Sequence, residues 1–191
     1  MTDPKVMYWW YLMSGIALFN MVLWYFALRK YNSTWANSTS VVQKIRKYQL
    51  HLASVYTLGC AFRSVFPRAD LRRLVLLDTW VSAIVIGRTV ATIAELCFVL
   101  QWSYLLYEIG LHTKNKTILS LAKWPFPIIV IAELFSWYAC TTSNYLGTII
   151  EESLWAVAAA ISLYGFILAR LEYAKKQLLF IHTAIIAAIS Y

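Results

Sequence analysis

Long runs of apolar residues, separated by short polar segments, dominate this 191-residue sequence. A run of about 18 or more apolar residues with few charges is typical of a helix that crosses a membrane. The runs lie near residues 7–28, 47–66, 78–107, 125–145, 147–169 and 177–191. They predict an all-α protein, a polytopic transmembrane helical bundle of about six spans that forms a single membrane-embedded domain over residues 1–191.

Two stretches depart from this simple pattern. The run 177–191 is shorter than the roughly 20 residues that a crossing needs, so we expect an incomplete span and a sequence that is a piece of a longer chain. Pro67 lacks a backbone donor and is expected to end the second span. The segment 69–77 that follows carries Arg72 and Arg73 among apolar residues. This mixture predicts a short helix lying in the membrane interface.

The composition excludes an ordinary soluble domain. Charged residues make up 14% of the chain and hydrophobic residues 61%, whereas soluble domains have about 25% charged residues. The formal net charge of +8 comes largely from lysines and arginines gathered in alternate loops, which is the bias that sets membrane topology. It predicts an N-terminus on the non-cytoplasmic side of a membrane that the sequence does not identify. The basic residues therefore give no reason to expect nucleic acid as a partner.

Two glutamates interrupt the apolar runs: Glu95 lies in "TIAELCF" and Glu133 in "VIAELFS". A charged side chain at the bilayer centre costs about 3 kcal/mol on insertion scales, so it tends to face the bundle interior and to pair. Arg88 precedes Glu95 by seven residues, which places both on one face of a helix. Glu133 opens a polar stripe, at steps of three and four, that ends at Asn144. These two polar faces are predicted to pack against each other.

Depth along the predicted helices, at about 1.5 Å per residue, divides the polar residues into two groups. The inner group combines carboxylates with imidazoles, which suits acid/base catalysis. The predicted catalytic residues are Glu95, Glu133, His51 and His182. The outer group is predicted to bind a substrate, together with one aromatic residue of the polar stripe. These residues are Arg88, Asn144, Glu151, Glu152 and Trp137.

The same groups have structural interpretations that the sequence does not exclude. Arg88 is expected to pair with Glu151 or Glu152, either as a clamp for an anion or as an ion pair that fixes two helices. The glutamates are equally suited to hydrogen bonds that join helices. No HxxH, HxxxH or ExxH spacing occurs, so no metal site is predicted, and no motif identifies a cofactor.

Three classes of function remain open. The first is an enzyme that acts by acid/base chemistry on a lipid or another apolar small molecule. The second is a structural or assembly subunit of a membrane complex, whose polar stripes contact its own helices or a homo- or hetero-oligomeric partner. The third is a proton-coupled transporter or channel that uses the same glutamates as a relay. The lipid bilayer is the expected surrounding in all three.

Overall fold

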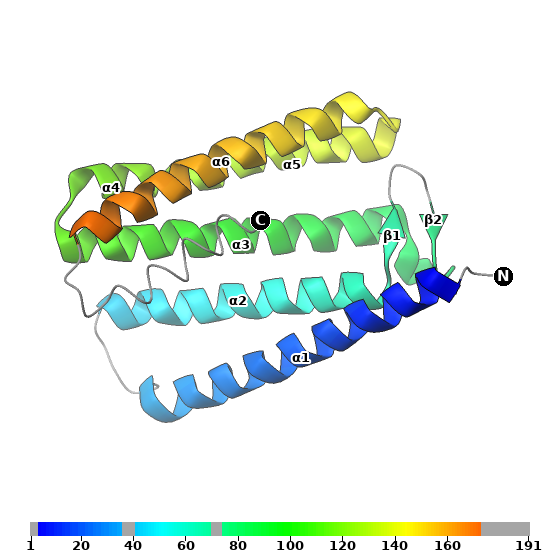
Figure 1. Ribbon diagram of the computed structural model, residues 1–191, viewed down its shortest axis with the longest axis horizontal. Coiled ribbons are helices and arrows are strands. Elements are labelled where there is room, and N and C mark those ends of the chain that lie inside the picture. Colours follow the sequence, from blue (N-terminus) through cyan, green and yellow to red (C-terminus); the bar gives the residue numbers. More distant parts are fainter. Residues whose placement is uncertain (1–3, 36–40, 70–73, 173–191) are drawn as a thin grey trace. The chain divides into compact units, whose positions relative to one another are not determined.

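The computed structural model describes residues 4–35, 41–69 and 74–172 of the chain, and the predicted sixth span, 177–191, lies outside the described residues. Helices make up most of the described chain, together with one short two-stranded hairpin (Figure 1). The chain divides into two compact units, Met1–Phe98 and Val99–Tyr191. The single membrane-embedded domain over residues 1–191 stays a prediction.

The first unit begins with two antiparallel helices, α1 (Pro4–Trp35) and α2 (Val41–Val65), which lie side by side (Figure 1). The hairpin β1 (Arg68–Ala69) and β2 (Leu74–Val75) follows, then a single 3₁₀ turn, η1 (Trp80–Ser82). The unit ends with the first half of α3 (Ile84–Thr113). Both α1 and α2 begin several residues before the predicted runs 7–28 and 47–66, because helical hydrogen bonding continues beyond an apolar segment.

The interfacial helix predicted over residues 69–77 is contradicted at Ala69, Leu74 and Val75, which lie in strands, whereas residues 70–73 lie outside the described residues. β1 pairs with β2 in antiparallel register, Arg68 opposite Val75 and Ala69 opposite Leu74. A proline disfavours the helical conformation in the residue before it and cannot donate to a preceding turn. The chain therefore leaves α2 in an extended conformation, and its backbone groups pair across the hairpin instead of along a helix.

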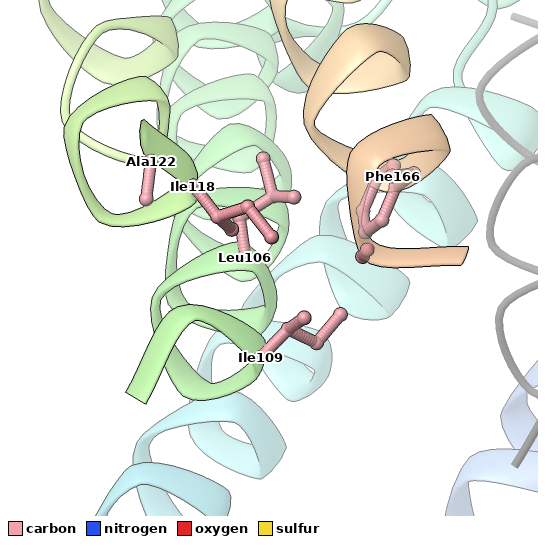
Figure 2. Close-up of a cluster of buried hydrophobic side chains, with 6 residues drawn as sticks. Leu106, Ile109, Ile118, Ala122 and Phe166 are labelled. Carbon is pink, nitrogen blue, oxygen red and sulfur yellow. The ribbon is translucent and has the colours of Figure 1, made fainter. Parts of the chain in front are cut away.

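The second unit consists of the end of α3, the short helix α4 (Lys116–Leu121), α5 (Pro125–Thr142) and α6 (Tyr145–Glu172). Figure 2 shows the buried apolar cluster that joins α3, α4 and α6 at one end of this unit. Its buried members are Leu106, Ile109, Ile118, Ala122, Phe166 and Ala169. Helices α5 and α6 agree with the predicted spans 125–145 and 147–169 to within three residues at each end.

A tight turn lets α5 and α6 pack as an antiparallel pair. Ser143 ends α5 in the left-handed conformation, with φ 56°. Asn144 then accepts a hydrogen bond from the backbone N–H of Leu146 at 2.9 Å, which caps the start of α6. Gly147 faces α5 so closely that a Cβ atom there would lie 2.7 Å from the carbonyl oxygen of Phe135. The absence of a side chain at Gly147 is what permits this approach.

Four helices in the described residues are long and apolar enough to cross a membrane. They are Pro4–Tyr31, Ile84–Thr113, Lys116–Thr142 and Tyr145–Glu172, the third comprising α4 and α5. The six predicted spans are therefore not confirmed. Helix α2 forms where the second span was predicted but is not among these four, because polar residues such as Gln49 and His51 lower its mean hydropathy together with its basic residues. Lys44 and Lys47 lie at its beginning and Arg63 at its end.

Candidate functional site

An ionic cluster joins α2 to α3 in the first unit. The Arg63 Nη1 atom of α2 lies 3.5 Å from Glu95 Oε1, and the Arg88 Nη2 atom of α3 lies 3.5 Å from Glu95 Oε2. Each carboxylate oxygen of Glu95 therefore has its own guanidinium partner. Arg88 and Glu95 are adjacent because seven residues amount to about two turns of helix, as the sequence predicted.

Close packing of α2 on α3 brings Arg63 to Glu95. A Cβ atom built on Gly59 of α2 would lie 2.7 Å from the Cβ atom of Ala94, so a larger residue at position 59 would push the two helices apart. One turn away, the rings of Tyr56 and Phe98 stack with centroids 4.7 Å apart and an interplanar angle of 21°. The glycine sets the distance between the helices, and the aromatic pair fixes their register.

The three charged side chains differ in burial, which determines how strongly each interacts. Arg88 is 7% exposed and Glu95 17%, whereas Arg63 is 46% exposed. A charge pair shielded from water is screened far less than an exposed one. Arg88 and Glu95 therefore form the strong part of the cluster. Both carboxylate oxygens of Glu95 are engaged in ion pairs with guanidinium groups. This arrangement suits a residue that holds α2 and α3 together better than the predicted acid/base catalyst.

The sequence did not identify Arg63 as a partner of Glu95. One signal was present: Arg63 lies inside the predicted span 47–66, four residues before Pro67. A charge inside a span needs a partner of opposite sign. The sequence offers acids on several helices, however, and does not indicate which of them faces α2.

A groove of about 550 Å³ lies between α1 and α2. Its lining is mostly apolar and rich in alanine. The lining residues are Met13, Ile16, Ala17, Asn20, Leu23, Trp24, Ala27, Leu50, Ala53, Tyr56, Thr57, Cys60, Ala61 and Ser64. Small side chains facing each other across the two helices leave this space open. No signal in the sequence pointed to it, because it depends on which faces of α1 and α2 meet.

Hydrogen bonds hold α1 on α2 toward both ends of the groove. Trp24 Nε1 donates to Ser54 Oγ at 2.7 Å, and this pair is called the tryptophan clamp below. Ser14 Oγ donates to the carbonyl oxygen of Ser64 at 3.5 Å, and this pair is called the serine clamp. Beyond the serine clamp, Trp10 Nε1 donates to the carbonyl oxygen of Val65 at 3.1 Å. These polar contacts therefore help to fix the spacing of the two helices.

The wall of the groove borders the ionic cluster. Cys60 lines the groove on the same helix as Arg63, about one turn before it. Tyr56 also lines the groove while its ring stacks on Phe98. Helix α2 thus presents a mostly apolar face to the groove and Arg63 to α3.

Two carboxylates meet within the second unit. Oxygen atoms of Glu133 on α5 and Glu151 on α6 lie within 4.8 Å of each other, and Glu133 is 3% exposed. Two carboxylates at this distance are compatible only if a proton or a positive charge accompanies them. The sequence assigned Glu133 to an inner group and Glu151 to an outer one. For these two residues the division does not hold, because α5 and α6 run antiparallel and bring them to the same level.

The remaining predicted site residues are dispersed. Asn144 caps α6, and its Nδ2 atom donates to the Tyr138 hydroxyl at 3.2 Å. Glu152 is exposed, and Trp137 is half-buried on α5. His51 is exposed on α2, twelve residues or about 18 Å along the helix from Arg63, so the structure does not bring it to Glu95. His182 lies outside the described residues.

The fold and these sites define the class of the protein in broad terms. Four apolar helices with polar groups inside them are typical of a multi-pass integral membrane protein. Comparison with protein-family models, with curated proteins and with solved structures finds no match to this chain.

Proposed function

We propose that this integral membrane protein binds a lipid-soluble molecule in the groove between α1 and α2. The observation that carries the proposal is the groove itself, about 550 Å³ of space between two helices that lie side by side. Small-molecule sites in proteins have volumes of about 300–1,000 Å³ and mostly apolar linings. The groove agrees with both properties.

Packing physics supports occupation of the groove. Protein interiors are close-packed, with few voids larger than a water molecule. An unfilled space costs dispersion contacts on every side chain that lines it. Water has little affinity for a wall of Ala17, Ala27, Ala53 and Ala61, whereas an apolar chain would restore those contacts. The clamps hold α1 and α2 apart at fixed points, so the helices do not collapse to close the space.

The surroundings of α1 support entry from the bilayer. Only 6% of the apolar window of α1 is buried inside the protein, and large side chains such as Leu18, Phe19 and Phe26 are exposed. A helix of this kind is in contact with lipid along most of its length. A molecule dissolved in the bilayer therefore reaches the groove without crossing water.

Binding is better supported than the other functions that the sequence left open. Acid/base catalysis at Glu95 and Glu133 stays a prediction, and the ion pairs of Glu95 weigh against it. The groove lies in the first unit on the face of α2 that carries Tyr56 and Cys60, so a bound molecule would contact those residues. A transporter or an assembly subunit has no comparable observation in its favour.

Filling the groove tests the proposal. The full chain is extracted from membranes in polymer-bounded native discs, and retained small molecules are measured by native mass spectrometry and by solvent extraction. Ala53→Phe places a ring in the groove, whereas Val55→Phe places the same ring on the exposed side of α2. We expect a retained apolar molecule in the wild type and in Val55→Phe, and its loss in Ala53→Phe.

A second variant guards against misfolding. Ala27 lines the groove from an exposed position on α1, so Ala27→Phe obstructs it with little disturbance of the helix contact. Helix content from circular dichroism identifies the variants that fold. Retention of the same molecule by a folded Ala53→Phe or Ala27→Phe variant, or the absence of any retained molecule from the wild type, overturns the proposal.

A further inference from the structure

We infer that the groove selects an uncharged lipid carrying a hydroxyl or carbonyl group, which Asn20 and Thr57 hold near the middle of the membrane. The inference rests on the proposed function and specifies the chemistry of its ligand. Asn20 of α1 and Thr57 of α2 are strongly polar residues in a lining that is otherwise dominated by apolar side chains. Each offers both a hydrogen-bond donor and an acceptor.

Neither side chain is hydrogen-bonded to another residue that the structure describes. Among the residues that the structure describes, Asn20 and Thr57 have no side-chain hydrogen bond, whereas Ser54 and Ser64 both donate to the backbone of their own helix. Asn20 is also exposed. A polar group in hydrocarbon without a partner costs several kcal/mol. A partner supplied by a bound molecule removes that cost, which gives these two residues a direct role in binding.

The register of α1 on α2 places the two residues at one level of the groove. Asn20 lies between the α1 members of the serine and tryptophan clamps, and Thr57 lies between their α2 members. In antiparallel helices, residues that lie at the same level have residue numbers with a constant sum. That sum is 78 for both clamps and 77 for Asn20 and Thr57, so Asn20 and Thr57 lie within about one residue of the same level. The two polar groups therefore act together on one part of a ligand.

Their depth distinguishes this ligand from the bulk phospholipids. Asn20 lies sixteen residues after Pro4 and eleven before Tyr31, the limits of the first apolar helix. At 1.5 Å per residue these separations are about 24 Å and about 17 Å, which puts Asn20 near the centre of a hydrocarbon core about 30 Å thick. Phospholipid tails present only hydrocarbon there and leave both residues unsatisfied.

Charge complementarity defines the ligand further. Within the described part of the chain, none of the residues that line the groove is an aspartate, glutamate, lysine or arginine. A charged ligand group at this depth would lack a counter-ion and would carry a large desolvation cost. A hydroxyl or a carbonyl group needs only one or two hydrogen bonds, which an amide and a hydroxyl side chain supply. The ligand class is therefore a neutral alcohol or ketone with an apolar body.

Photocrosslinking in native discs tests this selection. Four diazirine probes with the same hydrocarbon chain are compared: a mid-chain alcohol, a mid-chain ketone, the plain alkane and a terminal fatty acid. The proteins are the wild type, Asn20→Leu, Thr57→Val, the double variant and the control Thr89→Val, which removes an exposed threonine on α3. Mass spectrometry of peptides locates the labelled positions on α1 and α2.

We expect the alcohol or the ketone to label the wild-type groove at least about fivefold more than the alkane or the fatty acid, equivalent to one net hydrogen bond. Asn20→Leu and Thr57→Val should each reduce that preference, the double variant should abolish it, and Thr89→Val should leave it unchanged. The better of the two neutral probes identifies whether the natural ligand is an alcohol or a ketone.

The outcomes separate this inference from the proposed function. Equal labelling by the alcohol, the ketone and the alkane overturns the selection but leaves the groove as a binding site. No groove labelling by any probe overturns both. If the Asn20→Cys variant forms a disulfide-linked dimer in native discs, a second copy of the chain covers this face. That result would likewise overturn both the selection and the binding site.

Discussion

The two arginines of the ionic cluster provide a matched pair for testing how burial sets the strength of an ion pair in this protein. Arg63 and Arg88 each lie 3.5 Å from an oxygen of the same carboxylate, that of Glu95. They differ in exposure, 46% against 7%. The perturbation is the replacement of each by methionine, which keeps an unbranched apolar stem and removes the charge.

Coulomb's law gives the expected magnitudes. At 3.5 Å, two unit charges interact by about 5 kcal/mol at an effective dielectric constant of about 20 and by about 1 kcal/mol in bulk water. Arg88 is buried, so the effective dielectric constant of about 20 applies to it, and loss of one partner from a buried pair costs about 3–5 kcal/mol. Arg63 is closer to the condition in bulk water, and exposed pairs contribute about 0–1 kcal/mol. We therefore expect Arg88→Met to destabilise the fold by about 3 kcal/mol and Arg63→Met by less than about 1 kcal/mol.

The assay is unfolding of the full chain in mixed micelles, by titration with dodecyl sulfate and by heating, followed by circular dichroism. For a chain of this size 1 kcal/mol shifts the melting temperature by about 2–4 °C, so Arg88→Met should melt about 6–12 °C lower than the wild type. The double variant Arg88→Met with Glu95→Leu removes both charges and should recover about half of the loss or more. Equal losses for Arg63→Met and Arg88→Met would refute the reasoning, because burial would then not decide the strength of the pair.

Two further predictions concern the helix contacts. Gly147→Ala should destabilise the second unit by about 1–3 kcal/mol, because the added Cβ would lie 2.7 Å from the Phe135 carbonyl oxygen. Its control, Gly15→Ala, has open space around the added Cβ and should stabilise α1 by about 0.5–1 kcal/mol through helix propensity. The same dodecyl sulfate titration measures both variants, and an unchanged stability of Gly147→Ala would contradict the close approach of α5 and α6. Asn115→Ala should cost about 1 kcal/mol, because Asn115 Oδ1 accepts from the N–H groups of Thr117 and Ile118 at the start of α4 and Asn115 Nδ2 donates to Glu172 at 2.8 Å. Faster hydrogen exchange confined to α4 and the end of α6 is the expected signature, and unchanged exchange there would count against the cap.

Local sequence was sufficient wherever a structural feature depends on one helix alone. The apolar runs predicted α1, α3, α5 and α6, because the need to satisfy backbone groups in hydrocarbon makes a long apolar segment helical. The seven-residue spacing of Arg88 and Glu95 predicted their adjacency, since the helical repeat is a property of the backbone. The prediction of an interfacial helix over residues 69–77 failed because the backbone of Arg68 and Ala69 pairs with that of Leu74 and Val75, a contact between two segments that the local pattern does not indicate.

Tertiary structure decided every feature that joins two helices. The pairing of Arg63 with Glu95 depends on the close approach at Gly59, and the meeting of Glu133 with Glu151 depends on the turn that follows α5. The groove exists because particular alanines of α1 face particular alanines of α2, at a spacing held by the two clamps. Helix periodicity indicates which side chains share a face, but which faces meet depends on the register between helices, and that register results from packing and hydrogen bonds between residues far apart in the sequence.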